Sequence, residues 1–248
     1  MEPALDLHQL TKCFGDKTAV DAVSFSLEPG AFLGLLGRNG AGKSTTLKMI
    51  TGLLKPTSGH IRVLGMDMAS EPLAIKRQIG AMPEDMALLD MLTGPQYLRF
   101  VGRMYGMADA TLDSRRAELF DLLDLAPGPK TLISDYSFGM KKKVALCAAL
   151  IHGPKILFLD EPFEGIDPVT SRTIKDILHS LQQRGVTLVL TSHILEVVEK
   201  LCPTLAILDE GRLKGFGSLA DLRQGNESLE QLFVDLVGGG QKGELSWL

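Results

Sequence analysis

A glycine-rich stretch near the start of the chain most constrains what it can fold into. Gly37, Gly42, Lys43 and Ser44 satisfy the spacing G-x-x-x-x-G-K-[ST]. The apolar run 32–36 precedes this stretch and has the length and composition of a buried strand. Apolar residues recur at helical spacing after it: Leu47, Ile50, Leu53 and Leu54. We therefore expect a strand, a tight glycine turn and a helix, in that order.

A turn of this composition is suited to hold phosphate groups. Glycines let successive backbone N–H groups converge on an anion because no Cβ atom stands in the way, and the following helix adds its positive N-terminal end. Lys43 is expected to reach the β- and γ-phosphates of a triphosphate, and the Ser44 hydroxyl to ligate Mg²⁺. The alternative is a turn that only joins strand to helix, which the full pattern disfavours. The residues expected at the nucleotide are Gly37, Arg38, Asn39, Gly40, Ala41, Gly42, Lys43, Ser44 and Thr45.

Two acidic residues follow a second buried-strand signal. The apolar run 156–159 ends in Asp160 and Glu161, at the carboxyl end of the strand, where open α/β sheets place ligand chemistry. Asp160 can hold Mg²⁺, and Glu161 can orient and deprotonate an attacking water. An ordinary acidic loop is the alternative, and it is common in isolation.

A third strand signal carries a histidine to the same place. The run 186–190 leads into Thr191, Ser192 and His193, and strand-helix-strand order implies that this strand runs parallel to the one before Asp160. His193 would then face the phosphate and could hydrogen-bond the γ-phosphate or the water. A purely structural histidine is the alternative.

Two further positions have both a structural and a functional interpretation. Phe14 lies beside the turn 15–17, between two expected antiparallel strands, where it can cover a small apolar cluster or stack on an adenine. The phosphate-binding pattern favours stacking. Ser137 precedes an expected helix and, with Gly139, offers a hydroxyl and free N–H groups to an anion. From these residues alone, an ordinary helix cap is the favoured interpretation.

The order of the elements indicates an α/β fold with an insertion. Helical signals dominate over residues 85–153, which we interpret as a helical subdomain within one larger domain, 1–225. Thr93 can cap a helix that carries Met104 on its apolar side, and Asp109 or Thr111 can cap the next helix. Asp167 can cap a later helix that bears Val169, and the runs 205–208 and 212–213 are expected to form a closing hairpin. Residues 226–248 are expected to add a short C-terminal helix and a tail. The tail contains Trp247, and the sequence leaves open whether it docks on the domain or on a partner.

Composition limits the partners. The net charge is −4 and the obvious cationic run, 141–143, is short, so nucleic acid is not an expected partner. Cys13, Cys147 and Cys202 are far apart and lack metal spacing, which indicates reduced cytosolic residues. No run is long and apolar enough to span a bilayer, and the N-terminus does not resemble a signal peptide. Any link to a membrane is therefore expected to run through a partner.

Four patterns occur in a characteristic order: GRNGAGKST, ILFLDEP, GIDP and TSH. With the more specific YSFGM pattern at 136–140, they make the chain similar to the ATP-binding subunits of ATP-binding cassette transporters over about residues 5–222. The resemblance implies a P-loop NTPase core, that is, a RecA-like mixed or parallel sheet flanked by helices. It also implies an antiparallel β subdomain beside the inserted helical one.

The resemblance also implies a role for individual residues. By position, Phe14 corresponds to the adenine-stacking aromatic, and Glu84 to the loop that senses Mg²⁺ and contacts the membrane subunit. Ser137 and Gly139 correspond to the signature that grips the γ-phosphate of the other subunit. The remaining correspondences are Asp160 to the Mg²⁺-associated acid, Glu161 to the general base, Asp167 to the dimer-contact loop and His193 to the switch histidine.

The function implied is ATP hydrolysis that drives a separate integral membrane permease from the cytoplasmic face of the membrane. A second ATP-binding subunit, identical or closely related, would complete a head-to-tail pair around two ATP molecules. Glu84 stands where the family usually has glutamine, and Phe138 and Met140 depart from the usual signature. These departures favour an exporter. The alternatives are a soluble ATP-gated switch on a non-membrane partner, such as ribosomes or DNA, and a subunit that binds ATP without turnover.

Overall fold

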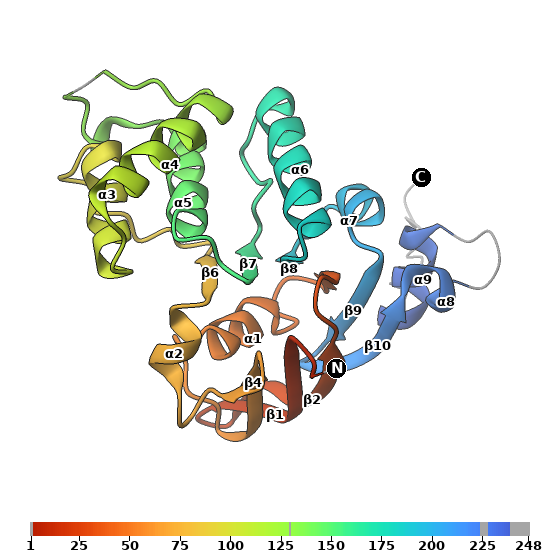
Figure 1. Cartoon of the computed structure of the whole chain (residues 1–248). Helices are drawn as coiled ribbons and strands as arrows, with labels where there is room; N and C mark the ends of the chain where they lie inside the picture. The colour runs from red at the N-terminus through yellow and green to blue at the C-terminus, as the bar shows by residue number, and fades with distance from the viewer. Residues whose placement is uncertain (1, 129, 224–227, 239–248) are drawn as a thin grey trace, which may run out of the picture.

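The computed structural model describes residues 2–128, 130–223 and 228–238, so Trp247 and most of the predicted tail lie outside the described residues. Its centre is a six-stranded sheet in the order β10-β9-β3-β8-β7-β6 (Figure 1). Strands β9, β3, β8, β7 and β6 are parallel, and β10 pairs antiparallel with β9 as the predicted closing hairpin. The strand bounds are β3 Phe32–Leu36, β6 Ile79–Met82, β7 Ile156–Asp160, β8 Thr187–Thr191, β9 Thr204–Asp209 and β10 Arg212–Ser218.

Both faces of this sheet are covered, which explains why its strands are continuous apolar runs. Phe32 and Leu36 belong to the cluster on one face, where helices α5, α6, α7 and α9 pack. Leu33 and Leu35 belong to the cluster on the other face, with α1 and the second sheet. The helix bounds are α5 Phe138–Leu150, α6 Pro168–Gln183, α7 Leu195–Leu201 and α9 Leu229–Val237, with the short α2 Pro72–Lys76 and α8 Leu219–Leu222.

The second sheet is antiparallel, in the order β2-β1-β4-β5, as the resemblance implies. Leu5 pairs with Leu27 and Leu7 with Phe25, and these apolar residues point inward while polar residues alternate with them. Helix α1 lies between the two sheets (Figure 1). The bounds are β1 Leu5–Phe14, β2 Lys17–Leu27, α1 Lys43–Ile50, β4 Ser58–Val63 and β5 Met66–Asp67.

Helices α3 (Gly94–Met104) and α4 (Asp109–Leu122) pack with α5 on one side of the large sheet, within the segment predicted to be helical. Thr93 caps α3 as predicted: the N–H of Gln96 donates to its Oγ1, and Gln96 Oε1 accepts from the Thr93 N–H. A short 3₁₀ turn, η1 (Ile133–Asp135), precedes α5.

Several predicted helix details are wrong. Helix α1 ends at Ile50 because Gly52 adopts φ +67°, so Leu53 and Leu54 lie beyond the helix. The N-cap of α4 is Ala108, without a side-chain cap, and not Asp109 or Thr111. Met104 and Val169, predicted on apolar helix faces, are exposed.

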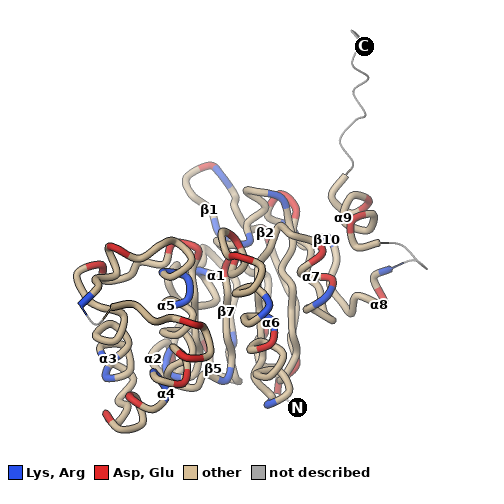
Figure 2. Tube along the Cα trace, turned by 90° about the horizontal axis from the view of Figure 1, so that it is seen from above, with Lys and Arg blue, Asp and Glu red and all other residues tan. Residues whose placement is uncertain are grey.

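The charged side chains of the described residues do not form a continuous band of one sign. Figure 2 shows Lys and Arg interspersed with Asp and Glu over the elements of the described chain. Among these same residues, no helix combines the length and the apolar character needed to cross a lipid bilayer.

Candidate active site

The glycine-rich loop joins β3 to α1 and is packed too closely for side chains at two positions. A Cβ on Gly37 would lie 2.5 Å from the carbonyl oxygen of Leu208. Gly42 has φ +101°, and a Cβ there would lie 2.6 Å from the carbonyl oxygen of Ala19. The glycines therefore let the loop fit between the β9–β10 turn and β2 while α1 begins at Lys43.

Lys43 folds back over this loop. Its ammonium donates to the carbonyl oxygens of Gly37 (2.8 Å) and Arg38 (3.3 Å), and its side chain is almost fully buried. An ammonium has three N–H donors, so one remains for a ligand beside the N-terminus of α1. The loop thus has the positive charge that a phosphate requires.

Asp160, at the end of β7, is held by hydroxyl groups from two other elements. The Oγ of Ser44 donates to Asp160 Oδ1 at 3.2 Å, and Oγ1 of Thr191 donates to the same oxygen at 2.5 Å. Ser44 is the second residue of α1, and Thr191 is the last residue of β8. The predicted meeting of the glycine loop with the two strand ends is therefore confirmed.

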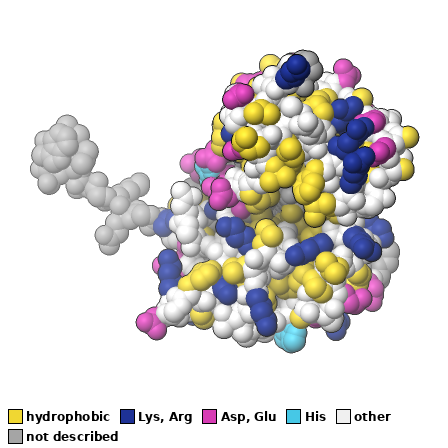
Figure 3. Space-filling view, turned by 90° about the vertical axis from the view of Figure 1, so that its left-hand side faces the viewer, with side chains coloured by type: hydrophobic (Ala, Val, Ile, Leu, Met, Phe, Trp, Pro, Cys, Tyr) yellow, Lys and Arg dark blue, Asp and Glu magenta, His cyan; other side chains and the backbone are white. Residues whose placement is uncertain are grey.

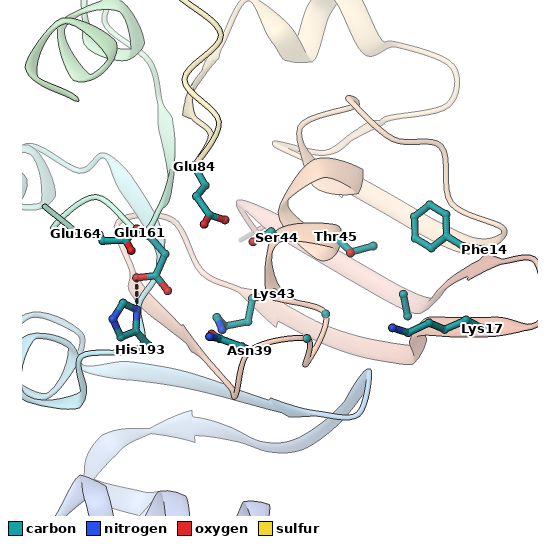
Figure 4. A pocket seen from close by; sticks show the side chains of 13 residues that line it. Phe14, Lys17, Asn39, Lys43, Ser44, Thr45, Glu84, Glu161, Glu164 and His193 are labelled. Carbon is teal, nitrogen blue, oxygen red and sulfur yellow. Dashed lines mark hydrogen bonds and ion pairs between the residues drawn. The ribbon is translucent and has the colours of Figure 1, made fainter. Parts of the chain in front are cut away.

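Glu161 follows directly and adopts φ +48°, a left-handed conformation that is rare for a residue with a side chain. Its backbone N–H donates to Thr191 Oγ1 at 3.0 Å. Nδ1 of His193 lies 3.0 Å from Glu161 Oε2 (Figure 4). The acid and the histidine thus form one pair at the carboxyl edge of the sheet.

An open cleft of about 630 Å³ runs along these residues. Figure 4 shows Phe14 and Lys17 toward one end, Glu161, Glu164 and His193 at the other, and Lys43 between them. Phe14 is 51% exposed, so its ring is available to a ligand. The lining residues are Phe14, Lys17, Ala19, Asn39, Gly40, Gly42, Lys43, Ser44, Thr45, Glu84, Glu161, Glu164 and His193.

Six of the predicted site residues are not part of this lining. Gly37 and Ala41 are buried under the loop, and Asp160 lies behind Ser44. Arg38 is directed away and donates to the carbonyl oxygen of Gly238, at the end of α9, at 2.6 Å. The last two, Ser137 and Gly139, lie at the N-terminus of α5.

Ser137 and Gly139 lie at the N-terminus of α5, outside the cleft. Ser137 is the N-cap, and its Oγ accepts from the N–H of Met140 at 3.2 Å. The cap at Ser137 is as predicted, and a single copy of the chain does not bring this helix end to Lys43. Asp167 caps α6, and hydrogen bonds from Thr170 hold the pKa of its carboxyl group below the usual value.

The prediction omitted three lining residues: Lys17, Ala19 and Glu164. Lys17 follows Phe14 across a tight turn. It is far from the glycine loop in the sequence, so no local pattern indicated that it lines the same cleft. Glu164 stands in the segment that follows Glu161, so a search of the whole strand-end loop for acids could have found it.

The donor set also fits a divalent cation. Mg²⁺ prefers oxygen ligands, and Ser44 Oγ and Asp160 Oδ1 lie 3.2 Å apart with the carboxylate of Glu84 on the same cleft. Ser44 and Asp160 are thus the residues that would hold the cation.

Comparisons with known proteins agree with this geometry. Residues 20–164 match the sequence model of the family described as ABC transporter. The linearmycin resistance ATP-binding protein LnrL of Bacillus subtilis is 40% identical over 232 residues, which cover 93% of this chain and 75% of that protein. The probable multidrug ABC transporter ATP-binding protein YbhF of Escherichia coli is 37% identical over 246 residues. These cover 95% of this chain but 42% of YbhF, so the chain spans less than half of that relative.

Solved structures show the same fold. One, described as the ATP-binding subunit of an ABC transporter, has a TM-score of 0.89 at 32% identity and covers 94% of this chain and 99% of its own. Another is the ATP-binding cassette MJ0796 as a dimer in a post-hydrolysis state with ADP and phosphate. Its TM-score is 0.80 at 25% identity, covering 87% of this chain and 98% of its own. On its sequence, fold and cleft, the chain belongs to the ABC transporter family, as an ATP-binding and ATP-hydrolysing cassette.

Proposed function

We propose that ATP binds along the cleft with its adenine on Phe14 and its phosphates on the glycine loop, and that Glu161 is the general base. The observation that carries this proposal is the order of groups along one cleft: an exposed aromatic ring, then a lysine at a helix N-terminus, then a carboxylate paired with a histidine. This order matches the base, the phosphates and the attacking water of a nucleotide.

Each side chain has a separate task in the hydrolysis. Lys43 and the N–H groups at the start of α1 bind the β- and γ-phosphate oxygens and stabilise the charge that develops on them. The Glu161 carboxylate accepts a proton from water as the water oxygen attacks the γ-phosphorus in line with the leaving β-phosphate oxygen. His193 holds the Glu161 carboxylate, and its half-exposed ring would contact the γ-phosphate of the bound nucleotide.

Ser44 and Asp160 would hold Mg²⁺, with Glu84 beside them. When bound, the cation would offset the negative charge of the phosphates. The carboxylate of Glu84, in place of the usual amide, adds charge at this point.

A second ATP-binding subunit completes the site in this proposal. Ser137 is exposed and Gly139 is partly exposed on one copy, which leaves them available to the γ-phosphate held by another. The structural relative MJ0796 is described as a dimer. We therefore assign Ser137 and Gly139 to the neighbouring subunit's ATP, where the α5 N-terminus would add positive charge.

The membrane partner would dock on the face seen in Figure 3. There, apolar side chains gather in the hollow between the helical part and the core, with Lys and Arg around them. A small pocket between α1 and the end of β6 is lined in part by Leu53, Met82 and Pro83. The part of the chain from the end of α1 to α3 carries large exposed apolar residues that a docked partner would cover: Leu53, Leu73, Leu89, Met91, Phe100 and Met104.

We further propose that the partner is an integral membrane permease, that this chain acts at the cytoplasmic face, and that transport is outward. The support for export comes from the relatives, which are named for linearmycin resistance and multidrug transport. Residues 1–225 would form the ATP-binding domain, with 85–153 as the helical insertion that docks the permease, and 226–248 the C-terminal helix and tail.

Affinity purification from gently solubilised membranes tests the partner. A tagged chain should recover a polytopic membrane protein in stoichiometric amount. Met91, which is 79% exposed, supplies the variant: Met91→Asp should lose the membrane protein while the purified cassette keeps its ATPase rate. Val234→Asp, on the exposed side of α9, is the matched control and should keep the partner. Recovery only with ribosomal or DNA-associated proteins would replace the permease by the soluble-switch alternative.

A further inference from the structure

A buried lysine on α5 is not used by the site described so far. Lys142 is the middle residue of the run 141–143, yet it is only 1% exposed, and its ammonium donates to the carbonyl oxygen of Glu161 at 2.6 Å. Burial of an ammonium group is costly unless a partner holds it. The Glu161 carbonyl oxygen therefore stabilises the buried ammonium, and the ammonium in turn holds that carbonyl group in place.

The backbone of Glu161 is held both at its N–H group and at its carbonyl oxygen. Thr191 Oγ1 accepts its N–H from β8, and Lys142 binds its carbonyl oxygen from α5. A left-handed φ of +48° at a glutamate persists only where the surroundings hold it. Without the Lys142 contact, only the Thr191 bond would hold the backbone of Glu161, and a rotation toward an ordinary conformation would carry the carboxylate away from His193.

Lys142 also connects Glu161 to the first turn of α5. Phe138 lies four residues earlier on the same face, and the Lys142 ammonium is 5.2 Å from the centre of its ring. The same ring packs on Gly165, where a Cβ would lie 2.6 Å from Phe138 Cε1. Phe138, a departure from the usual signature, thus packs over the ammonium and against the loop that leads to α6.

The charge of Lys142 is balanced locally. Burial lowers its pKa from the usual value, and four carboxylates near it oppose that shift: Glu164, Glu161, Glu84 and Asp160. A cation at this point is therefore matched to the acidic end of the cleft.

We propose that Lys142 is a positioning residue for hydrolysis, which fixes the Glu161 backbone in its left-handed conformation and makes the orientation of the base depend on the first turn of α5. The inference rests on the proposed role of Glu161. In the proposed dimer, the α5 N-terminus meets the other subunit's γ-phosphate, so engagement there would be transmitted through Lys142 to the base of its own subunit.

Steady-state phosphate release as a function of ATP concentration tests this. Lys142→Met keeps the length and removes the donor, and we expect kcat to fall about 10- to 100-fold with KM within about twofold, because a displaced base impairs chemistry and not ATP binding. Lys142→Arg keeps a cationic donor and should restore kcat to within about threefold. Lys141→Met, the control on the same helix, removes a surface pair with Asp90 and should match the wild type.

A double-mutant cycle separates positioning from a general structural role. In a Glu161→Gln background, Lys142→Met should lower the residual single-turnover rate by less than about twofold, because the base through which Lys142 acts is already absent. A full additional loss in that background would overturn the inference, and so would a wild-type kcat in Lys142→Met alone.

Two further outcomes are informative. If Lys142→Met does not fold, Lys142→Gln keeps a polar end without the same reach, and a lowered kcat at unchanged KM supports the inference whereas a wild-type kcat contradicts it. A wild-type chain that binds ATP but releases no phosphate would contradict the proposed function itself. A normal wild-type rate that Lys142 variants do not change would overturn only the role of Lys142.

Discussion

Thr191→Val removes one hydroxyl that holds both acids of the site. The Thr191 side chain is fully buried, and its Oγ1 donates to Asp160 at 2.5 Å and accepts from the Glu161 N–H at 3.0 Å. Valine has nearly the same shape, so it leaves no cavity. The variant therefore isolates the two hydrogen bonds.

The size of the effect follows from these contacts. A buried N–H left without a partner costs about 1–3 kcal/mol, and a hydrogen bond to a carboxylate contributes about 1.5–3 kcal/mol. Asp160 keeps its bond from Ser44, so we expect a total loss of about 3 kcal/mol. For a chain of 248 residues this lowers Tm by about 6–12 °C. Because Glu161 loses its N–H anchor, kcat should also fall about 10- to 100-fold.

The assay combines thermal unfolding with ATP turnover in three variants. Thr191→Ser keeps the hydroxyl and should retain kcat while it loses about 1 kcal/mol for the missing methyl group. Thr187→Val, at the other end of β8, removes a buried hydroxyl that accepts from the Gly30 N–H, and should lower stability by about 1–2 kcal/mol without a change in kcat. A Thr191→Val protein with wild-type kcat would refute the view that this hydroxyl positions the base.

Two other predictions concern the loop and a buried histidine. Lys43→Ala should weaken ATP binding by about 3 kcal/mol, or roughly a hundredfold in Kd by calorimetry, while Lys48→Ala on the exposed side of α1 leaves Kd unchanged; equal affinities would disprove the phosphate contact. Burial lowers the pKa of His152. Between pH 7 and 5.5 the unfolded chain therefore binds more protons at this residue than the folded chain does, so the free energy of unfolding decreases as the pH is lowered. His152→Gln should therefore show a smaller loss of unfolding free energy over that range in urea titrations, and an unchanged pH slope would contradict the assignment.

Much of the site could be predicted from the sequence because it depends on strand ends. Parallel strands meet at one edge, so the residues that follow buried runs must lie together, and Asp160, Glu161 and His193 do so. The glycine loop was predictable for a similar reason. Its spacing indicates a phosphate-binding loop only where a strand precedes it and a helix follows it. The cap at Ser137 likewise depends on local chemistry.

What the sequence did not predict depends on tertiary contacts. A run of three lysines indicates an exposed surface, and no periodicity identifies Lys142 as the one that is buried under Phe138. Met104 and Val169 satisfy helical spacing but lie on faces that no described element covers. Helical spacing predicts which residues share a face, but the packing of other elements decides whether that face is buried.

The site at Ser137 also shows a limit of a single chain. Its residues lie outside the cleft of their own subunit, so the role that we propose for them depends on a second subunit. Only the resemblance to the family, and not the local chemistry, favoured a ligand there over an ordinary helix cap.

ATP binding and light scattering of Glu161→Gln test the central claim most directly. If Glu161 is the base and two cassettes enclose ATP, the variant should bind ATP with near-wild-type affinity, release phosphate at least about 100-fold more slowly, and form a dimer of twice the 26.9 kDa chain mass with ATP but not with ADP. A variant that hydrolyses ATP at the wild-type rate, or that binds ATP and stays a monomer while the wild type turns over, would contradict the account.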